Sequence, residues 1–176
     1  MRLTAGIGLV LLVVCAMVAR AAGHAHEHGV AKLDIAVETG KLTIELDSPL
    51  DNLLGFERAP RTDAERKAAD AAVAQLRAAQ LMFVIDPAAA CTLDTVELSS
   101  AALKLGHPDP KEEQEGHVDI DGSFEFKCAD ATKAAFIDVG LFGFARLQRL
   151  EVQVATPRAQ FKRELKRPAK RIVLTR

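Results

Sequence analysis

The feature that most constrains the fold is a regular alternation of apolar and polar residues in two neighbouring segments. Apolar side chains occupy every second position of 33–37 and again of 42–46. Successive side chains of a β-strand point to opposite faces of its sheet, so each segment is predicted to form a strand with one buried face. Thr39 and Gly40 lie between them and are typical of a tight turn. The sequence therefore predicts an antiparallel hairpin.

One long helix is predicted after this hairpin. Thr62 followed by Glu65 is a capping-box sequence, in which each side chain bonds the backbone N–H of the other residue. The stretch 63–79 is rich in Ala, Lys, Arg and Gln and contains neither glycine nor proline, which favours a helix. Its apolar positions are few, so we expect the helix to pack on a sheet by one weak face.

The other predicted elements are mostly strands. They are a second hairpin of 83–85 and 92–98 around Asp86-Pro87, a strand over 118–128 with a turn or bulge at Gly122, a short helix over 131–137, and strands over 147–155, 161–166 and 171–175. Together with the first hairpin and the helix, they predict an α+β fold made mainly of antiparallel β hairpins with one long helix.

A faint internal repeat suggests that the fold consists of two β-rich lobes. Residues 40–46 parallel 122–128, and 53–58 parallel 141–146. A polar, acidic stretch with two prolines lies between the copies, and such a composition is typical of a linker. The predicted organisation is a signal peptide at 1–21, a histidine-rich tail at 22–29, a first lobe at 30–105 with its helix at 63–79, an acidic linker at 106–117 and a second lobe at 118–176.

The first 21 residues predict export from the cytoplasm. Arg2 precedes an apolar run over 3–18, and Ala19-Arg20-Ala21 has the small residues of a signal-peptide cleavage site. The run is shorter than the about 20 residues of a membrane span, so we expect a periplasmic protein that is peripheral to the membrane at most. Lipidation of Cys15 is an alternative, which the bulky preceding residue Val14 disfavours.

Two cysteines, Cys91 and Cys128, remain after removal of the leader. Two cysteines in an exported chain most often pair with each other. A zinc site built on them would need further ligands, and neither cysteine has one beside it in the sequence. We therefore predict one structural disulfide, which stabilises the fold by about 3–4 kcal/mol because the loop that it closes is long.

Composition argues against two classes of function. The chain contains no Trp and no Tyr, whereas surfaces that bind single-stranded nucleic acid rely on aromatic stacking. It also lacks the sequence motifs of serine hydrolases, P-loop proteins, zinc proteases and dinucleotide-binding enzymes. We therefore expect a protein that is not an enzyme and that does not bind nucleic acid.

All five histidines lie in two polar segments. His24, His26 and His28 alternate just after the predicted cleavage site, and His107 and His117 bracket the acidic part of the linker. Alternate residues of an extended chain project to one side about 6.5–7 Å apart, so their imidazoles can converge on one ion. Neutral imidazole suits Zn, Cu and Ni, which makes these residues the candidate metal ligands. The alternative is a pair of solvated segments that bind no metal.

The position of the signal-peptide cleavage site decides whether a second kind of metal site can form. Cleavage after Ala21 would expose Ala22-Gly23-His24, a free amine with histidine in third place. The amine, two amides and the imidazole then form a square-planar nitrogen set, the geometry that Cu(II) and Ni(II) prefer. Cleavage one residue later would abolish this set.

Several stretches of the chain carry a family resemblance. They are HEHGVAKLDIAVE, SPLDNLLGFERAPRTDAERKA, VELSS, FEFKC, LQRLEVQV and QFKRELKRP, which are spread over nearly the whole mature chain. In these stretches the chain resembles the ZrgA-like family of bacterial periplasmic zinc-binding accessory proteins, formerly a domain of unknown function. The similarity is strongest in the opening histidines and hairpin and in Leu53–Glu57.

The resemblance implies zinc binding in the periplasm and a supporting role in zinc uptake beside an ABC importer. In that family, binding is attributed largely to a long histidine-rich stretch, whereas 107–117 here has two histidines among carboxylates. The leading interpretation is a non-enzymatic protein that captures or buffers Zn(II), with the tail histidines as principal and the linker histidines as auxiliary ligands. The alternative is a metal-independent envelope module whose sheet surface or basic C-terminal strands dock a partner.

Overall fold

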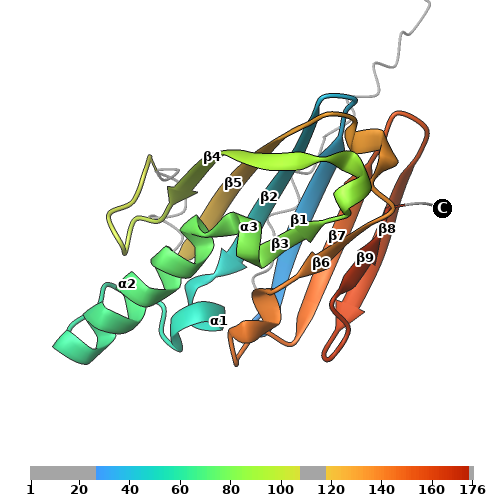
Figure 1. Ribbon diagram of the computed structural model, residues 1–176. Helices are drawn as coiled ribbons and strands as arrows, with labels where there is room; N and C mark the ends of the chain where they lie inside the picture. Colours follow the sequence, from blue (N-terminus) through green and yellow to red (C-terminus); the bar gives the residue numbers. More distant parts are fainter. Residues whose placement is uncertain (1–26, 108–117, 175–176) are drawn as a thin grey trace, which may run out of the picture.

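Two β-sheets and one long helix make up the framework of the molecule (Figure 1). The computed structural model describes residues 27–107 and 118–174. Its elements, in chain order, are β1 (Val30–Val37), β2 (Lys41–Pro49), α1 (Leu50–Leu54), α2 (Asp63–Arg77), α3 (Ala79–Met82), β3 (Phe83–Ile85), the 3-10 turn η1 (Pro87–Ala89), β4 (Cys91–Ser99), β5 (Asp119–Cys128), η2 (Ala131–Lys133), β6 (Phe136–Val139), η3 (Leu141–Gly143), β7 (Arg149–Ala155), β8 (Gln160–Lys166) and β9 (Arg171–Val173).

The larger sheet has six strands in the order β4-β5-β2-β1-β7-β8. β1 and β2 form the predicted antiparallel hairpin, with Leu33 opposite Leu46 and Val37 opposite Leu42. β7 lies parallel to β1, whereas the other neighbouring strands are antiparallel. The smaller sheet has the antiparallel order β3-β6-β9. The predicted α+β class with mainly antiparallel strands is therefore confirmed.

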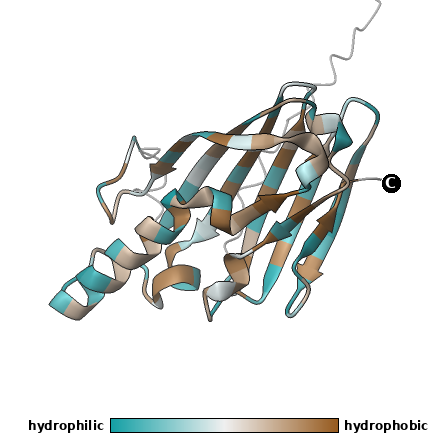
Figure 2. Cartoon of the chain, viewed as in Figure 1, coloured by the Kyte–Doolittle hydropathy of each residue, from teal (hydrophilic) through white to brown (hydrophobic). Residues whose placement is uncertain are grey.

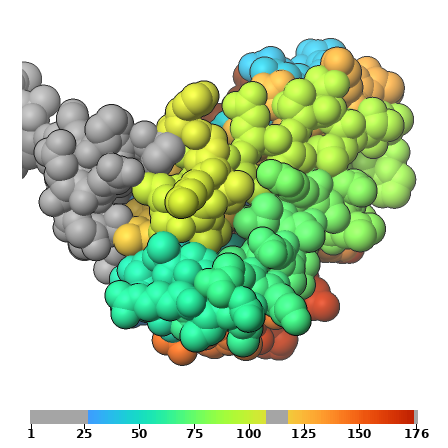
Figure 3. All heavy atoms as spheres, turned by 90° about the vertical axis from the view of Figure 1, so that its left-hand side faces the viewer, coloured from blue at the N-terminus to red at the C-terminus, as the bar shows by residue number. Residues whose placement is uncertain are grey.

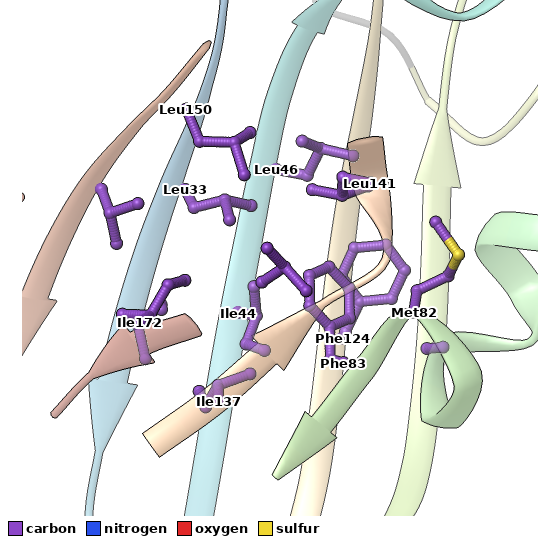
Figure 4. Packing of buried hydrophobic residues seen from close by; sticks show 14 of the residues in the cluster. Leu33, Ile44, Leu46, Met82, Phe83, Phe124, Ile137, Leu141, Leu150 and Ile172 are labelled. Carbon is purple, nitrogen blue, oxygen red and sulfur yellow. The ribbon is translucent and has the colours of Figure 1, made fainter. Parts of the chain in front are cut away.

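The smaller sheet covers one face of the larger sheet, and the hydrophobic core lies between them (Figures 1 and 4). Phe83 of β3 packs against Phe124 of β5 with the ring centroids 5.0 Å apart. Ile137 and Ile172 of the smaller sheet lie in the same buried layer as Ile44 of β2. Figure 2 shows apolar and polar residues alternating along the strands. The alternation that predicts the hairpin thus separates this core from the polar face behind it.

α2 begins at the predicted position and has the predicted capping box. The Oγ1 of Thr62 accepts the N–H of Glu65 at 3.1 Å, and a Glu65 carboxylate oxygen accepts the N–H of Thr62 at 3.2 Å. The helix ends at Arg77 rather than at the predicted Ala79, where α3 begins. Its buried residues are Ala69, Ala72 and Leu76. Residues of α2 form part of the molecular surface in Figure 3. No helix in 27–107 or 118–174 is long and apolar enough to cross a membrane.

The predicted hairpin of 83–85 and 92–98 is wrong, because its two strands belong to different sheets. β3 pairs with β6, whereas β4 pairs with β5. Asp86 directs the chain between the sheets: its Oδ1 accepts the N–H of Ala88 and its Oδ2 accepts the N–H of Ala135, both at 3.0 Å. These bonds hold the η1 turn against the segment that precedes β6.

The short helix predicted over 131–137 is also corrected. η2 covers only Ala131–Lys133, and the chain then enters β6, the middle strand of the smaller sheet. Ile137 and Val139 are buried in that strand, so packing between the sheets outweighs the local preference for a helix. The three strands predicted at the C-terminal end are confirmed as β7, β8 and β9.

The strand predicted over 118–128 is confirmed as β5, but Gly122 is not a turn or bulge. It pairs in regular register with Leu46 of β2 and Leu98 of β4. The irregularity lies instead in β4, where the register shifts between Leu93 and Thr95.

The segments predicted as two lobes contribute strands to the same sheet. β5, from the second segment, lies between β4 and β2 from the first, and β7 pairs with β1. The predicted disulfide joins Cys91 and Cys128, which stand opposite each other in the β4–β5 ladder. The linker therefore connects neighbouring strands of one sheet, and the disulfide closes the other end of the same pair of strands.

Candidate metal centre at one end of the larger sheet

The chain enters β1 through a tight turn. The N–H of Val30 donates to the carbonyl oxygen of Glu27 at 3.1 Å and closes this turn. Gly29 has a φ of +83° within it, a conformation that favours glycine. The N–H of Gly29 donates to Asn52 Oδ1 at 2.6 Å. His28 is therefore part of a turn that is fixed to the fold.

Asn52 of α1 fastens this turn to the ends of β1 and β2. Its side chain is fully buried, and Nδ2 donates to the carbonyl oxygen of Val30 at 2.7 Å and to Ser48 Oγ at 3.1 Å. With the bond from Gly29, both the oxygen and the nitrogen of the amide are in use. Loss of this amide would leave buried polar groups without partners, which is costly.

His28 and Glu57 form a pair at the surface beside the turn. His28 Nε2 lies 2.8 Å from Glu57 Oε1, and the two side chains are 62% and 30% exposed. A carboxylate accepts hydrogen bonds and donates none, so the hydrogen of this bond belongs to Nε2. In the neutral ring, Nδ1 then keeps its lone pair, which is the form in which imidazole binds a metal ion.

Other acidic side chains nearby are held by arginines. Glu27 Oε2 lies 2.6 Å from Arg149 Nη2, and Asp51 Oδ2 lies 3.0 Å from Arg146 Nε. Arg149 also bonds Glu164, and this bond is the largest cause of the raised pKa of the Arg149 guanidinium. Carboxylates in such charge-assisted bonds are less available to a metal ion.

The second histidine-bearing segment leaves the sheet at the same end. β2 ends and β5 begins at the pair Pro49 and Asp119. The N–H of Leu50 in α1 donates to the carbonyl oxygen of Val118 at 2.9 Å, so α1 contacts the end of the linker as well as the tail. β1 and β4 are three strand spacings apart in the sheet order, roughly 14 Å. The fold thus brings the tail and both ends of the linker to one end of the larger sheet.

His107 stands just beyond β4, with an exposed side chain. Ser100 and Leu105 form a bridge that turns the chain back, and Gly106 follows with a φ of +56°. A Cβ at Gly106 would lie 2.5 Å from the carbonyl oxygen of Leu98, so this close approach requires glycine. The position of His107 is therefore set by the backbone before it.

The predicted ligands fall into two groups. His28 is paired with Glu57, and His107 is exposed at the end of β4. The predicted ligands that lie outside the described residues are His24, His26 and His117. Within the described part of the chain, no three His, Cys, Asp or Glu side chains form a group that could hold a metal ion. Neither His28 nor His107 is therefore a member of such a group among the described residues.

Asn52 and Glu57 are two residues of the candidate site that the sequence does not predict. No regular element is predicted for the stretch in which both lie, although α1 forms there around Asn52. One signal did exist, because the family resemblance is strongest in the opening histidines and in Leu53–Glu57. These two stretches meet at the hydrogen bond between His28 and Glu57.

Comparison with known proteins agrees with this resemblance. Residues 25–174 match the family described as ZrgA family zinc uptake protein, a span that includes the tail turn, α1 and both strands beside the linker. No curated protein matches the chain. Because the family match covers most of the sequence, the chain belongs to the ZrgA family of zinc uptake proteins.

Proposed function

We propose that this protein binds Zn(II) as cargo outside the cytoplasm and assists its uptake by an ABC importer. Membership of a zinc uptake family supports the choice of metal, and the name of that family denotes transport rather than an enzymatic reaction. The observation that carries the proposal is the His28–Glu57 pair at the start of β1. Histidines that bind metals commonly donate their second ring nitrogen to such a carboxylate.

The proposed principal ligands are His24, His26 and His28, and His107 and His117 are auxiliary. The tail and the linker start from the same end of the larger sheet, which supports a shared site. Zn(II) takes four ligands, with each nitrogen about 2.0–2.1 Å away, so rings from both segments can share one ion. The exposure of the two described histidines suits an ion that must be released again.

A periplasmic location is part of the proposal. The disulfide between Cys91 and Cys128 supports it, since disulfides persist in oxidising compartments. The predicted signal peptide at 1–21 supports it independently. Zinc capture would then take place on the outer side of the inner membrane.

Zinc titration of the mature, tag-free protein tests the binding step. Competition with a chromophoric chelator should give a dissociation constant that is micromolar or lower. Replacement of the three tail histidines by Ala should weaken binding by roughly tenfold or more, and replacement of His107 and His117 should weaken it less. Absence of micromolar binding, or binding that the tail replacement leaves unchanged, would overturn the proposal.

Growth under zinc limitation tests the uptake step. Cells that lack the protein should grow poorly in the presence of a zinc chelator, and added zinc should restore their growth. Restoration by the wild-type gene, but not by a gene without the tail histidines, would connect uptake to this site. Growth that is indifferent to the deletion would contradict a role in uptake.

Two other functions are separate candidates. A metal-independent docking role is favoured by β8, an edge strand that exposes Lys162 and Lys166. A Cu(II) or Ni(II) role requires Ala22 as the first residue of the mature chain, which N-terminal sequencing decides. Competition between Cu(II) and Zn(II) is also needed, because most nitrogen sites prefer copper intrinsically.

A further inference from the structure

We infer that Glu57 is a positioning residue for His28: it holds the Nε2–H of the ring and thereby assigns Nδ1 as the atom that binds Zn(II). The inference rests on the proposed zinc-binding function and adds to it a residue that is not itself a ligand. It concerns two side chains that are distant in the sequence and lie 2.8 Å apart in the structure.

The backbone on both sides of His28 is fixed. On one side, Glu27 accepts the N–H of Val30 at 3.1 Å through its carbonyl oxygen, and its side chain bonds Arg149 at 2.6 Å. On the other side, the N–H of Gly29 bonds the buried Asn52 at 2.6 Å. The His28 ring can therefore vary its direction mainly through its own two torsions.

Glu57 also lies between two fixed points. Before it, the N–H of Gly55 donates to the carbonyl oxygen of Asp51 at 2.8 Å and ends α1 in a left-handed conformation. After it, the guanidinium of Arg58 bonds both carboxylate oxygens of Glu65, at 2.9 and 2.7 Å. The carboxylate that meets His28 is thus carried by a segment anchored to α1 and to the start of α2.

Pairing with a carboxylate decides which ring nitrogen a metal ion meets. A neutral imidazole has one N–H and one lone pair, and the metal takes the lone pair. While Glu57 holds Nε2–H, the lone pair is on Nδ1, and the carboxylate also makes the ring a stronger base toward the metal. Fixing the ring beforehand lowers the entropy lost on binding. Without Glu57, the ring can coordinate through either nitrogen.

Nuclear magnetic resonance of protein with 15N-labelled histidine and bound 113Cd(II) tests this assignment. Cadmium-113 replaces Zn(II) and shows scalar coupling to the nitrogen that it contacts. In the wild type, we expect coupling to Nδ1 of His28. In Glu57→Ala, the coupling should move to Nε2 or divide between the two nitrogens. Glu57→Gln retains an oxygen that accepts the same hydrogen bond, so it should retain coupling to Nδ1.

Zinc titration of the same variants gives a second readout. Glu57→Ala should bind Zn(II) about tenfold more weakly than the wild type, and Glu57→Gln should lose much less. Glu38→Ala is the matched control, because Glu38 is an exposed carboxylate in the turn at the other end of β1. Equal losses in the Ala and Gln variants would show that binding depends on the negative charge of Glu57 and not on the hydrogen bond that it accepts, and would overturn the positioning role.

The inference and the proposed function fail in different ways. A wild type that binds no Zn(II) would overturn the proposed function. A wild type that binds through its tail histidines, with affinity and coordinating nitrogen unchanged in Glu57→Ala, would overturn the positioning role and leave zinc binding in place. Circular dichroism should show that the variants fold, since the side chain of Glu57 is only half-buried and is not part of the hydrophobic core.

Discussion

At the scale of single residues, Glu65 joins several groups at the start of α2. Its carboxylate accepts the N–H of Arg61 at 2.6 Å and the N–H of Thr62 at 3.2 Å. The guanidinium of Arg58 bonds both of its oxygens. These interactions lower the pKa of Glu65 from 4.5 to about 2, and the hydrogen bond from Arg58 is the largest cause. The charged form of Glu65 is therefore favoured in the folded state.

The first prediction concerns the pH dependence of this cap. Because the pKa of Glu65 is lower in the folded state, its stabilisation is fully present above pH 4.5 and is lost as the pH falls toward about 2. Urea unfolding should show Glu65→Gln less stable than the wild type at neutral pH, and the difference should shrink at about pH 3. Thr62→Ala is the control, with a loss of about 1 kcal/mol at both pH values. A difference for Glu65→Gln that is independent of pH would contradict the prediction.

Gly122 is required by the ring of Phe124 rather than by a turn. A Cβ at Gly122 would lie 2.7 Å from Cζ of this ring and 3.2 Å from a methyl carbon of Leu98. Phe124 is fully buried and packs against Phe83, so its ring has no room to move away. The glycine thus makes space in the core at a regular position of β5.

The second prediction is that Gly122→Ala destabilises the fold by about 1–3 kcal/mol, because it overpacks this part of the core. Gly40→Ala is the matched control, since a Cβ at Gly40 meets no atom within 4 Å. Urea unfolding measures the free energy of unfolding of both variants. Equal stabilities for the two variants would show that the ring of Phe124 yields to the added methyl group.

At the scale of elements, β4 depends on β5 for its place in the sheet. β4 is an edge strand, and many of its side chains are exposed or half-buried. The disulfide between Cys91 and Cys128 fastens the start of β4 to the end of β5 and spans 37 residues of sequence. It constrains the unfolded chain over the whole loop that contains the linker.

The third prediction follows from this loop. Replacement of both Cys91 and Cys128 by Ser should lower the free energy of unfolding by about 2–4 kcal/mol. A reductant should lower the stability of the wild type to a similar level and should leave the double variant unchanged, which provides an internal control. Unfolding of the wild type that is insensitive to the reductant would contradict the prediction.

Elements with complete local signals could be predicted from the sequence, and elements defined by distant partners could not. The capping box of Thr62 and Glu65 contains its own partners, and the β1–β2 hairpin is specified by its alternation and turn. The sheet to which β3 belongs is decided by its pairing with β6, which lies about 50 residues further along the chain. Neither strand carries a local sign of that choice, so the predicted hairpin was wrong.

At the scale of the whole molecule, the same limit applies to the candidate site. His28 could be identified as a candidate ligand from its alternation with two other histidines. Its partner Glu57 could not, because α1 and the buried Asn52 bring the two residues together from separate parts of the chain. The sequence therefore predicts candidate ligands, whereas the fold supplies Glu57, the residue that we propose orients one of them.

The fourth prediction concerns the effect of Zn(II) on the free energy of unfolding of the whole protein. On the proposed function, the tail histidines, which are neighbours in the sequence, should bind Zn(II) in the unfolded chain as well, so that only extra affinity in the folded state adds stability. The Glu57 contact and the turn at Gly29 exist only in the folded state. If they strengthen binding about tenfold, saturating Zn(II) should raise the free energy of unfolding by about 1.4 kcal/mol.

Urea unfolding with saturating Zn(II) and with a chelator measures this gain. Glu57→Ala should lose most of it while its metal-free stability stays close to that of the wild type, because the side chain is only half-buried and is not part of the hydrophobic core. Asn52→Ala should instead lower the metal-free stability as well, since it leaves buried polar groups unpaired. A gain of equal size in the wild type and in Glu57→Ala would show that the extra affinity of the folded state does not depend on Glu57, whereas no gain in the wild type would place the zinc site entirely within the tail.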